Sequence, residues 1–232
     1  MRFPRPLVRA VLLRRYKRFL ADVRLMDGRV ATAHCANPGA MLGVASEGAE
    51  VWLMPSADPR RSLAWSWELI RVGEHLVGIN TGRPNALAAE AIALGRIPPL
   101  AGYATARREV AYGRQSRVDL LLEGPGRPIC YVEVKNVHLR RGAWAEFPDS
   151  VTARGARHLA ELQAMVQAGH RAVMLYVVQR GDCQGFRIAH DLDPVYALAC
   201  RAARAAGVEA LCYACEVGVD GIEIGRPLAL AP

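Results

Sequence analysis

The stretch Y-V-E-V-K-N, residues 131–136, alternates apolar and polar side chains along its length. Every second side chain of a β-strand points to the same face of its sheet, so the pattern predicts a strand with Val132 and Val134 in the core. Glu133 and Lys135 then share the opposite face. An exposed acid–base pair stabilises a fold by only about 0 to 1 kcal/mol, so ion pairing alone is a weak reason to place both charges there.

A second strand-like segment, residues 117–122, precedes this stretch and is joined to it by the turn sequence G-P-G-R-P. A symmetric hairpin centred on Gly126 places Asp119 opposite Glu133, and cross-strand partners have Cβ atoms about 4.5 to 5.5 Å apart. Alternation directs Val118 into the core with the valines of the first stretch. The sequence therefore predicts two carboxylates and one ammonium group at one spot on the sheet.

Two close carboxylates repel each other, and a divalent cation relieves that repulsion. Oxygen ligands with a water shell suit Mg²⁺ or Mn²⁺, whereas Zn²⁺ would prefer His and Cys. Asp119 and Glu133 are thus candidate metal ligands, and Lys135 a candidate catalytic group for phosphodiester hydrolysis. The alternative is a surface salt bridge, but the chain has 28 Arg and only two Lys, which favours a specific role for Lys135.

Two further acids are candidates for the same site. A helix is predicted after Thr81-Gly-Arg-Pro84, with Asn85 as its N-cap and Glu90 on or beside its apolar stripe. The stripe consists of Leu87, Ala91 and Leu94. Glu90 is therefore a candidate third metal ligand, and Glu109, in the strand before Asp119, is a fourth acid whose role the sequence leaves open.

A long helix is predicted over residues 152–167, with Thr152 as a possible cap and Gly169 after its end. Arg154 and His158 lie one turn apart on it, where they would either contact a phosphate or face solvent. The preceding loop, residues 138–150, contains two aromatic residues that would either stack on bases or pin the loop.

Charge is concentrated at the N-terminus of the 232-residue chain, whose net charge is +8. Residues 1–30 hold nine Arg or Lys against two Asp. Such a basic end favours an anionic polymer, DNA above all, over a merely solvated face. The residues expected to hold phosphates there are Arg14, Arg15, Lys17 and Arg18.

The composition, 52% hydrophobic and 22% charged, is typical of a folded globular protein. No apolar run approaches the roughly 20 residues that a membrane span needs, so a cytoplasmic protein with no membrane partner is expected. Its six cysteines are then reduced thiols, Cys212 and Cys215 included. The sequence leaves the oligomeric state open, a homodimer included.

Two units are predicted along the chain. Residues 5–80 alternate apolar and polar residues between turn signals, which indicates a small antiparallel barrel. Beyond residues 80–86, helices and strands are mixed in one α/β architecture. The predicted division is 1–82 and 83–232.

The order of an acid-bearing helix, an Asp strand, a Glu-x-Lys strand and a helix resembles the core of PD-(D/E)xK nucleases. Over nearly its whole length the chain resembles the sugar fermentation stimulation protein (SfsA) family. The matching segments are 14–23, 34–41, 77–81, 113–119, 131–136, 147–155 and 158–162. In one departure, Ala36 and Pro38 flank Asn37 where the family usually reads Pro-Asn-Thr-Gly. Pro38 lacks a backbone donor, which counts against a phosphate contact there.

This resemblance implies an OB-like N-terminal barrel, a restriction-endonuclease-like C-terminal domain, and DNA binding without marked sequence preference. It also implies a link to the regulation of sugar metabolism, particularly of maltose. It puts Asp119, Glu133 and Lys135 at the nuclease core positions, with Glu90 as the helix acid. Two hypotheses follow: a DNA-binding protein that cuts phosphodiester bonds with Mg²⁺ or Mn²⁺, or a non-catalytic DNA-binding transcriptional regulator that keeps the nuclease fold for binding.

Overall fold

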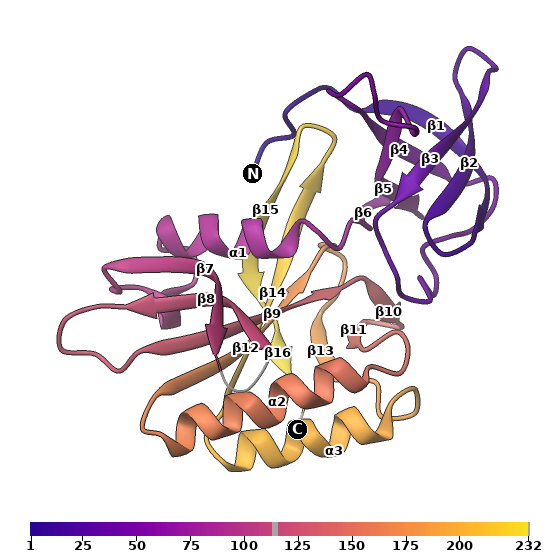
Figure 1. Cartoon of the computed structure of the whole chain (residues 1–232). Helices are drawn as coiled ribbons and strands as arrows, with labels where there is room; N and C mark the ends of the chain where they lie inside the picture. Colours follow the sequence, from indigo (N-terminus) through magenta and orange to yellow (C-terminus); the bar gives the residue numbers. More distant parts are fainter. Residues whose placement is uncertain (113–115, 232) are drawn as a thin grey trace.

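The chain forms two units, an N-terminal barrel and a C-terminal sheet covered by helices (Figure 1). A computed structural model describes residues 1–112 and 116–231. Residues 113–115, the first three of the G-R-Q-S-R-V-D motif, lie outside this described part. The predicted mixed α/β class with an N-terminal barrel is confirmed.

The barrel is a sheet closed on itself. Its strands are β1 (Val8–Tyr16), β2 (Leu20–Leu25), β3 (Val30–Cys35), β4 (Glu50–Pro55), β5 (Trp65–Val72) and β6 (His75–Gly78). The ladders in the order β3-β2-β1-β4-β5-β6 are antiparallel, as predicted, and a parallel pairing of β3 with β5 closes five strands into the barrel. Trp67 is fully buried in the barrel core.

The C-terminal unit is a six-stranded sheet between two helical layers. In sheet order its strands are β15 (Gly221–Pro227), β14 (Glu209–Gly218), β12 (Arg171–Val178), β9 (Cys130–Val137), β8 (Ser116–Glu123) and β7 (Thr105–Tyr112). The three central strands are parallel, and the outer pairings are antiparallel. The nearly all-apolar β12 is buried on both faces, as expected for a central parallel strand.

The sheet separates the core of this unit into two clusters, each covered by helices. Helix α1 (Pro84–Ala93) packs on one face of the sheet, followed by the short 3₁₀ helix η1 (Pro98–Leu100). Helices α2 (Ala153–Gln167) and α3 (Pro194–Ala205) pack on the other face. Val132 and Val134 point toward α1, as predicted for the apolar face of β9. The polar face of β9 therefore looks toward α2.

The predicted hairpin register is confirmed: the paired positions Leu120–Leu122 of β8 are symmetric with β9 about Gly126. Beyond Leu120 the ladder ends, and the Asp119 carboxylate accepts the backbone N–H of Val134 at 2.7 Å. This contact keeps Asp119 beside Glu133 where the two strands begin to part.

One core prediction on β8 is confirmed for burial but not for the cluster that the residue joins. Val118 is fully buried but packs with Tyr112 and Leu121 in a small separate cluster, rather than with Leu120 under α1. Beyond Leu120 the β8–β9 ladder ends and β8 remains paired only with β7, so Val118 does not pair with Val134 as the hairpin register predicted.

The segment predicted as a loop over residues 138–150 contains two strands. Strands β10 (Leu139–Arg141) and β11 (Trp144–Phe147) form a hairpin, and β13 (Gly185–Ile188) and β16 (Ala229–Leu230) complete a second small sheet. Phe147 packs against Tyr176 and Tyr196, with ring centroids 5.7 and 5.1 Å away. This aromatic residue therefore pins the segment instead of offering its face to a base.

The two units meet at a polar junction. The Asp149 carboxylate after β11 accepts the backbone N–H of Met41 in the barrel at 2.8 Å and contacts His138 Nε2 at 3.2 Å. The N–H of Gly78 in β6 donates to the carbonyl of Gln179 at 2.8 Å. A cavity of about 490 Å³ opens beside this junction, and we call it the interdomain groove. Its lining includes Arg18, Asn37–Gly39, Thr81, Asn136, His138 and Phe147–Arg154.

The first residues of the chain lie on the C-terminal unit, although the sequence assigned them to the barrel. Arg2 bridges Gly221, and the N–H of Phe3 donates to the carbonyl of Asp220 at 3.0 Å. All six cysteines are buried free thiols, as expected. Within residues 1–112 and 116–231, no helix is long and apolar enough to cross a membrane.

Candidate functional site

Three acidic residues form a row across neighbouring strands of the C-terminal sheet. The β7–β8 pairing sets Glu109 opposite Asp119, and the β8–β9 register sets Asp119 beside Glu133. Glu109 has a positive φ of 53°, a backbone conformation that costs a residue other than glycine about 1 to 2 kcal/mol. Strain of this kind occurs at binding sites more often than elsewhere.

The Asp119 carboxylate is held from both sides. One oxygen accepts the Val134 N–H, and the other accepts the side-chain amide of Asn85 at 2.7 Å. Burial raises the pKa of Asp119 above its usual value, and the negative charge of Glu133 raises it further. A cation at this position would reverse both effects, because it favours the ionised form.

Asn85 was predicted to cap α1, and this prediction was wrong. The N-cap is Arg83, with Pro84 at the first helical position, so Asn85 lies inside the first turn. A proline at the first helical position needs no backbone hydrogen bond, which explains the earlier start. Asn85 instead links Asp119 to Glu109, whose Oε1 lies 3.4 Å from its amide nitrogen.

Glu133 is the most enclosed acid of the site, with its side chain 3% exposed. Its Oε1 accepts from the Lys135 ammonium at 2.7 Å and from the imidazole of His158. Burial would raise the pKa of Glu133, but the His158 hydrogen bond and the Lys135 charge outweigh it and lower the pKa below its usual value. Among the described residues, Glu133 Oε2 is buried without any hydrogen-bond partner.

His158, expected to contact DNA, is buried beneath the surface of α2. The Arg154 Nε–H donates to its Nε2 at 3.2 Å, and because this group can only donate, Nδ1 carries the hydrogen that Glu133 accepts. Arg154 also lines the interdomain groove. A chain of two side chains thus leads from the groove to Glu133, and His158 acts on the site through the carboxylate.

The sequence reasoning missed two polar side chains of the site, Tyr112 and Glu161. The Tyr112 hydroxyl and Glu161 Oε2 are buried, and neither has a hydrogen-bond partner among the described residues. Burial raises the pKa of Tyr112, as do the negative charges of Glu133, Glu161 and Asp119. The available signal was spacing, since Glu161 follows His158 by three residues and so lies on the same helix face.

Glu90, predicted as the third metal ligand, lies elsewhere. Its carboxylate pairs with the N-terminal ammonium of Met1 at 2.6 Å, beside the β15 residue Ile222. The first residues of the chain, which lie on the C-terminal unit, provide this partner. The structure therefore does not bring Glu90 to Asp119 and Glu133.

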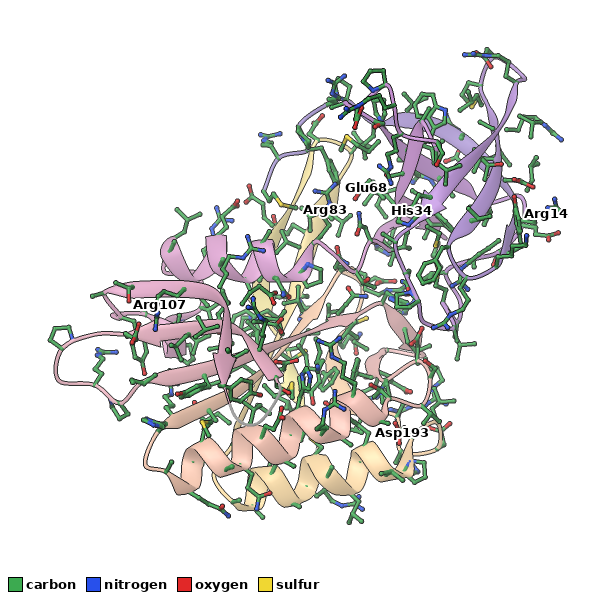
Figure 2. The ribbon with its side chains drawn as sticks, viewed as in Figure 1. Arg14, His34, Glu68, Arg83, Arg107 and Asp193 are labelled. Carbon is green, nitrogen blue, oxygen red and sulfur yellow. The ribbon has the colours of Figure 1, made fainter. Side chains whose placement is uncertain are left out.

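The four basic residues expected to hold phosphates differ in their surroundings. Arg14 pairs with Asp22 at 2.8 Å and lies on the side of the barrel away from the C-terminal unit (Figure 2). Arg15 donates to two carbonyls of the loop 37–39 and so braces it. Lys17 and Arg18 form the β1–β2 turn, and within the described part of the chain neither pairs with a carboxylate.

The residues of the site suit a divalent ion. In residues 1–112 and 116–231, no three His, Cys, Asp or Glu side chains converge as a ready-made metal-binding group. Two carboxylates, Asp119 and Glu133, would therefore hold the ion with water completing its shell. The buried oxygen of Glu133 without a donor fits this, because such an atom is costly unless a cation or water meets it.

An Asp strand beside a Glu-x-Lys strand, in a sheet sandwiched by helices and joined to a five-stranded barrel, defines a nuclease-like domain attached to an OB-type domain. The model of the SfsA N-terminal OB domain matches residues 13–79. The model of the sugar fermentation stimulation protein RE domain matches residues 82–221. The chain belongs to the sugar fermentation stimulation protein (SfsA) family, as its motifs predicted.

Relatives match over the full length. The sugar fermentation stimulation protein homolog of Rhodospirillum centenum is 62% identical over 232 residues, covering 100% of both chains. That of Paramagnetospirillum magneticum is 61% identical over 230 residues, covering 99% of this chain and 98% of the relative. A solved structure of Pyrococcus furiosus SfsA in complex with Ca²⁺ matches with a TM-score of 0.91 and 26% identity, covering 100% of this chain and 98% of that one.

Proposed function

We propose that this protein binds DNA without marked sequence preference and hydrolyses its phosphodiester bonds with Mg²⁺ or Mn²⁺. The observation that carries the proposal is the state of Glu133: a buried carboxylate beside Asp119 and Lys135, with one oxygen unpartnered among the described residues. The Ca²⁺ bound by the Pyrococcus furiosus relative supports the choice of a divalent ion.

Each side chain has a role in this proposal. Asp119 and Glu133 hold the ion, while Asn85 and the Val134 N–H keep the Asp119 carboxylate in place. When bound, Mg²⁺ or Mn²⁺ would act as a Lewis acid on the phosphoryl group and ready a water for attack. Lys135 would place its positive charge against the phosphate, where negative charge develops in the transition state.

The interdomain groove is the proposed path for DNA. Arg18 of the barrel and Arg154 of the C-terminal unit both line the groove, so each of the two units contributes a positive charge to it. Arg154 contacts His158, which contacts Glu133, so the groove passes within two side chains of the proposed metal ligands. Lys17 extends the basic surface along the β1–β2 turn.

A second candidate function has an observation in its favour. Lys135 and His158 already satisfy Glu133 Oε1, so the site holds together without an ion. That arrangement suits a DNA-binding protein that keeps the nuclease fold for binding only. The name of the family, sugar fermentation stimulation protein, supports a role of this candidate as a regulator of sugar metabolism.

A cleavage assay separates the two. Purified protein should cut labelled single-stranded, duplex or branched DNA when Mn²⁺ or Mg²⁺ is added, and a chelator should stop it. Glu133→Ala and Lys135→Ala should each lower the cleavage rate by at least about 100-fold while leaving DNA binding largely unchanged.

Glu223→Ala is the matched control, because it removes an exposed carboxylate, paired with Arg96, on the distant strand β15. It should leave both cleavage and binding unchanged. If the unaltered protein cuts none of these substrates with either metal, the enzymatic proposal fails and the regulator candidate stands.

A further inference from the structure

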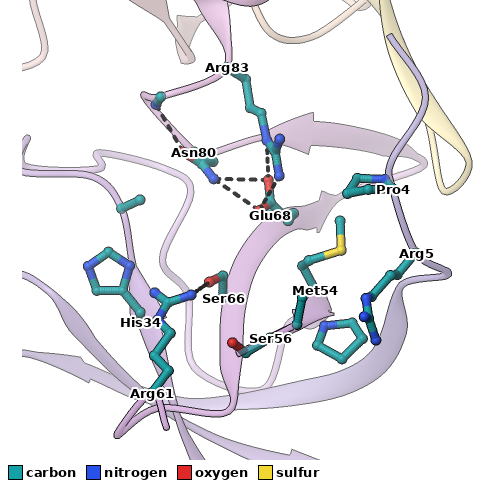
Figure 3. A pocket seen from close by; sticks show the side chains of 14 residues that line it. Pro4, Arg5, His34, Met54, Ser56, Arg61, Ser66, Glu68, Asn80 and Arg83 are labelled. Atoms are coloured by element: carbon teal, nitrogen blue, oxygen red, sulfur yellow. Dashed lines mark hydrogen bonds and ion pairs between the residues drawn. The ribbon is translucent and has the colours of Figure 1, made fainter. Parts of the chain in front are cut away.

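A second hollow, with a volume of about 450 Å³, lies at the barrel, and its lining shares no residue with that of the interdomain groove. Figure 3 shows Pro4, Arg5 and Met54 on one side of it and His34 and Arg61 on the other. The volume lies within the roughly 300 to 1,000 Å³ of small-molecule sites. We call this hollow the barrel pocket.

A buried ion pair anchors one wall of the barrel pocket. Glu68 is 2% exposed and accepts two hydrogen bonds from the Arg83 guanidinium, at 2.7 and 2.9 Å. The Asn80 amide lies 3.0 Å from both carboxylate oxygens (Figure 3). The negative charge of Glu68 is therefore compensated within the wall and does not oppose an incoming anion.

Two further guanidinium groups face the pocket with their charges uncompensated. Arg61 donates to the Ser66 hydroxyl at 3.0 Å, which uses one of its five N–H groups. Within the described residues, neither Arg61 nor Arg5 has a carboxylate within 4.0 Å, whereas the adjacent Arg60 pairs with Asp58. The pocket therefore has an excess of two positive charges.

The positive charge of Arg61 acts on the His34 side chain. His34 is the second-last residue of β3 and pairs with Ser66 in the ladder that closes the barrel. Burial lowers the pKa of His34, and the positive charge of Arg61 lowers it further. An anion placed against Arg61 would oppose this second effect, so the imidazole provides a spectroscopic reporter inside the pocket.

Apolar side chains form part of the remaining lining. Met54 and Pro55 end strand β4, and Pro4 closes the pocket from the N-terminal segment. A ligand with one anionic end and one flat or apolar end would therefore match the two sides of the pocket. A single nucleotide has this form, with a phosphate for Arg61 on one side and a sugar and base for Pro4 and Met54 on the other.

We propose that the barrel pocket binds a phosphate-bearing ligand the size of one nucleotide, with its phosphate held by Arg61. The ligand is either a free nucleotide or the terminal nucleotide of a DNA strand. This site needs no metal and no cleavage, so it stands apart from the proposed nuclease function. It adds an anchoring point on the barrel that the Asp119 and Glu133 site does not supply.

The test is an NMR titration of the His34 ring in the full-length chain, paired with calorimetry. The probes are inorganic phosphate, thymidine monophosphate, thymidine, and a short single-stranded DNA with or without a 5′-phosphate. Thymidine monophosphate should shift the His34 signals and raise its pKa, and thymidine should not. Preference for the 5′-phosphorylated strand over thymidine monophosphate would identify a DNA end as the source of the phosphate, and the reverse order a free nucleotide.

Arg61→Gln should weaken binding of thymidine monophosphate at least about tenfold, since it removes a hydrogen bond to a charged phosphate. Arg61→Lys should restore part of the affinity. Arg60→Gln is the matched control, with the same charge change on the same loop, and should bind normally. If no phosphate-bearing probe moves the His34 signals, or if Arg60→Gln weakens binding as much as Arg61→Gln, the proposal is overturned. Cleavage at Glu133 and Lys135 is measured separately and is unaffected by that outcome.

Discussion

At the scale of single residues, Glu133 is the side chain on which the site depends. It is buried, yet the hydrogen bond from His158 and the charge of Lys135 keep its pKa low, so it stays ionised in a setting that would otherwise favour the neutral acid. Burial raises the pKa of Asp119, and the negative charge of Glu133 raises it further. The two carboxylates therefore differ in their readiness to ionise, and Glu133 is the stronger anchor for a cation.

His158 orients that anchor, because Arg154 fixes its tautomer. His158→Leu should weaken Mn²⁺ binding about 10- to 100-fold, as expected when a group that orients a metal ligand is lost. It should also lower the free energy of unfolding by about 1 to 3 kcal/mol, because Glu133 loses a hydrogen-bond donor. Calorimetric Mn²⁺ titration measures the first effect and thermal unfolding the second.

His158→Gln retains an N–H donor and should recover part of the Mn²⁺ affinity. His190→Leu, at an exposed histidine, should leave Mn²⁺ binding as it is in the unaltered protein. Equal affinities in His158→Leu and the unaltered protein would show that the imidazole does not orient Glu133.

Sequence reasoning succeeded for the pair of strands, but it did not predict which helix side chains contact them. Alternation and a symmetric turn were enough to set Asp119 beside Glu133, because both are local properties of a hairpin. Which helix face meets that hairpin depends on tertiary packing. The contacts of Asn85, His158 and Glu161 with the site were therefore not predicted. Glu90 pairs with the N-terminal ammonium group, a contact that no local sequence pattern predicts.

At the scale of elements, the β1–β2 turn exposes two charged side chains at a cost in backbone strain. Lys17 and Arg18 have φ values of 47° and 63°, a left-handed conformation that costs a residue with a side chain about 1 to 2 kcal/mol. Glycine would adopt it freely. Two charged side chains occupy these positions instead, which indicates that their charge is the useful property.

Lys17→Gly should therefore change stability and DNA binding in opposite directions. The free energy of unfolding should rise by up to about 1 kcal/mol, because the left-handed strain is relieved. The slope of log K for DNA against log salt should fall by about one unit, because one phosphate contact is lost. Chemical unfolding and fluorescence anisotropy at several salt concentrations measure the two effects.

Lys17→Ala is the control, since it removes the same charge without relieving the strain. It should show the lower salt slope and no gain in stability. A salt slope that stays constant in both variants would place the DNA surface away from this turn.

The elements that the sequence did not reveal are the shortest ones. Strands β10, β11, β13 and β16 have two to four residues each, too few for alternation to show. Strands β10 and β11 were predicted as loop, and β13 and β16 were not predicted, yet their small sheet positions Asp149 at the junction. The long strands and α2, which carry clear periodicity and a Thr152 cap, were predicted closely.

At the scale of the whole molecule, Asp149 connects the two units. Its carboxylate accepts the Met41 N–H and faces His138, and a side chain at Gly39 would collide with it, since an added Cβ would lie 2.7 Å from its oxygens. The barrel loop and the C-terminal unit are thus fitted to each other through one acidic side chain. The interdomain groove depends on this fit.

Asp149→Ala should lower the free energy of unfolding near neutral pH by about 1 to 3 kcal/mol, because a buried N–H loses its acceptor. Burial would raise the pKa of Asp149, but the hydrogen bond and charge of His138 outweigh it and lower the pKa below 3.8. A depressed carboxylate pKa stabilises the fold above the unfolded value and loses that contribution as the pH falls through the folded value. The difference between the two proteins should therefore shrink below about pH 4.

Unfolding curves across pH 2 to 7 measure this difference. Asp191→Ala removes an exposed carboxylate paired with Arg141 and should leave the neutral-pH curve nearly unchanged. A constant gap between the Asp149→Ala variant and the unaltered protein at every pH would show that the ionised form of Asp149 is not what joins the units.

Because the chain has only two lysines, amine-selective labelling of its side chains is simple to interpret. Lys17 lies at the tip of a barrel turn and Lys135 in the sheet of the C-terminal unit, so each unit carries a single side-chain amine. An amine-selective reagent therefore meets one freely accessible lysine and one that is only 13% exposed. Without any engineered residue, acylation of Lys17 provides an internal reference against which shielding or uncovering of Lys135 can be read by mass.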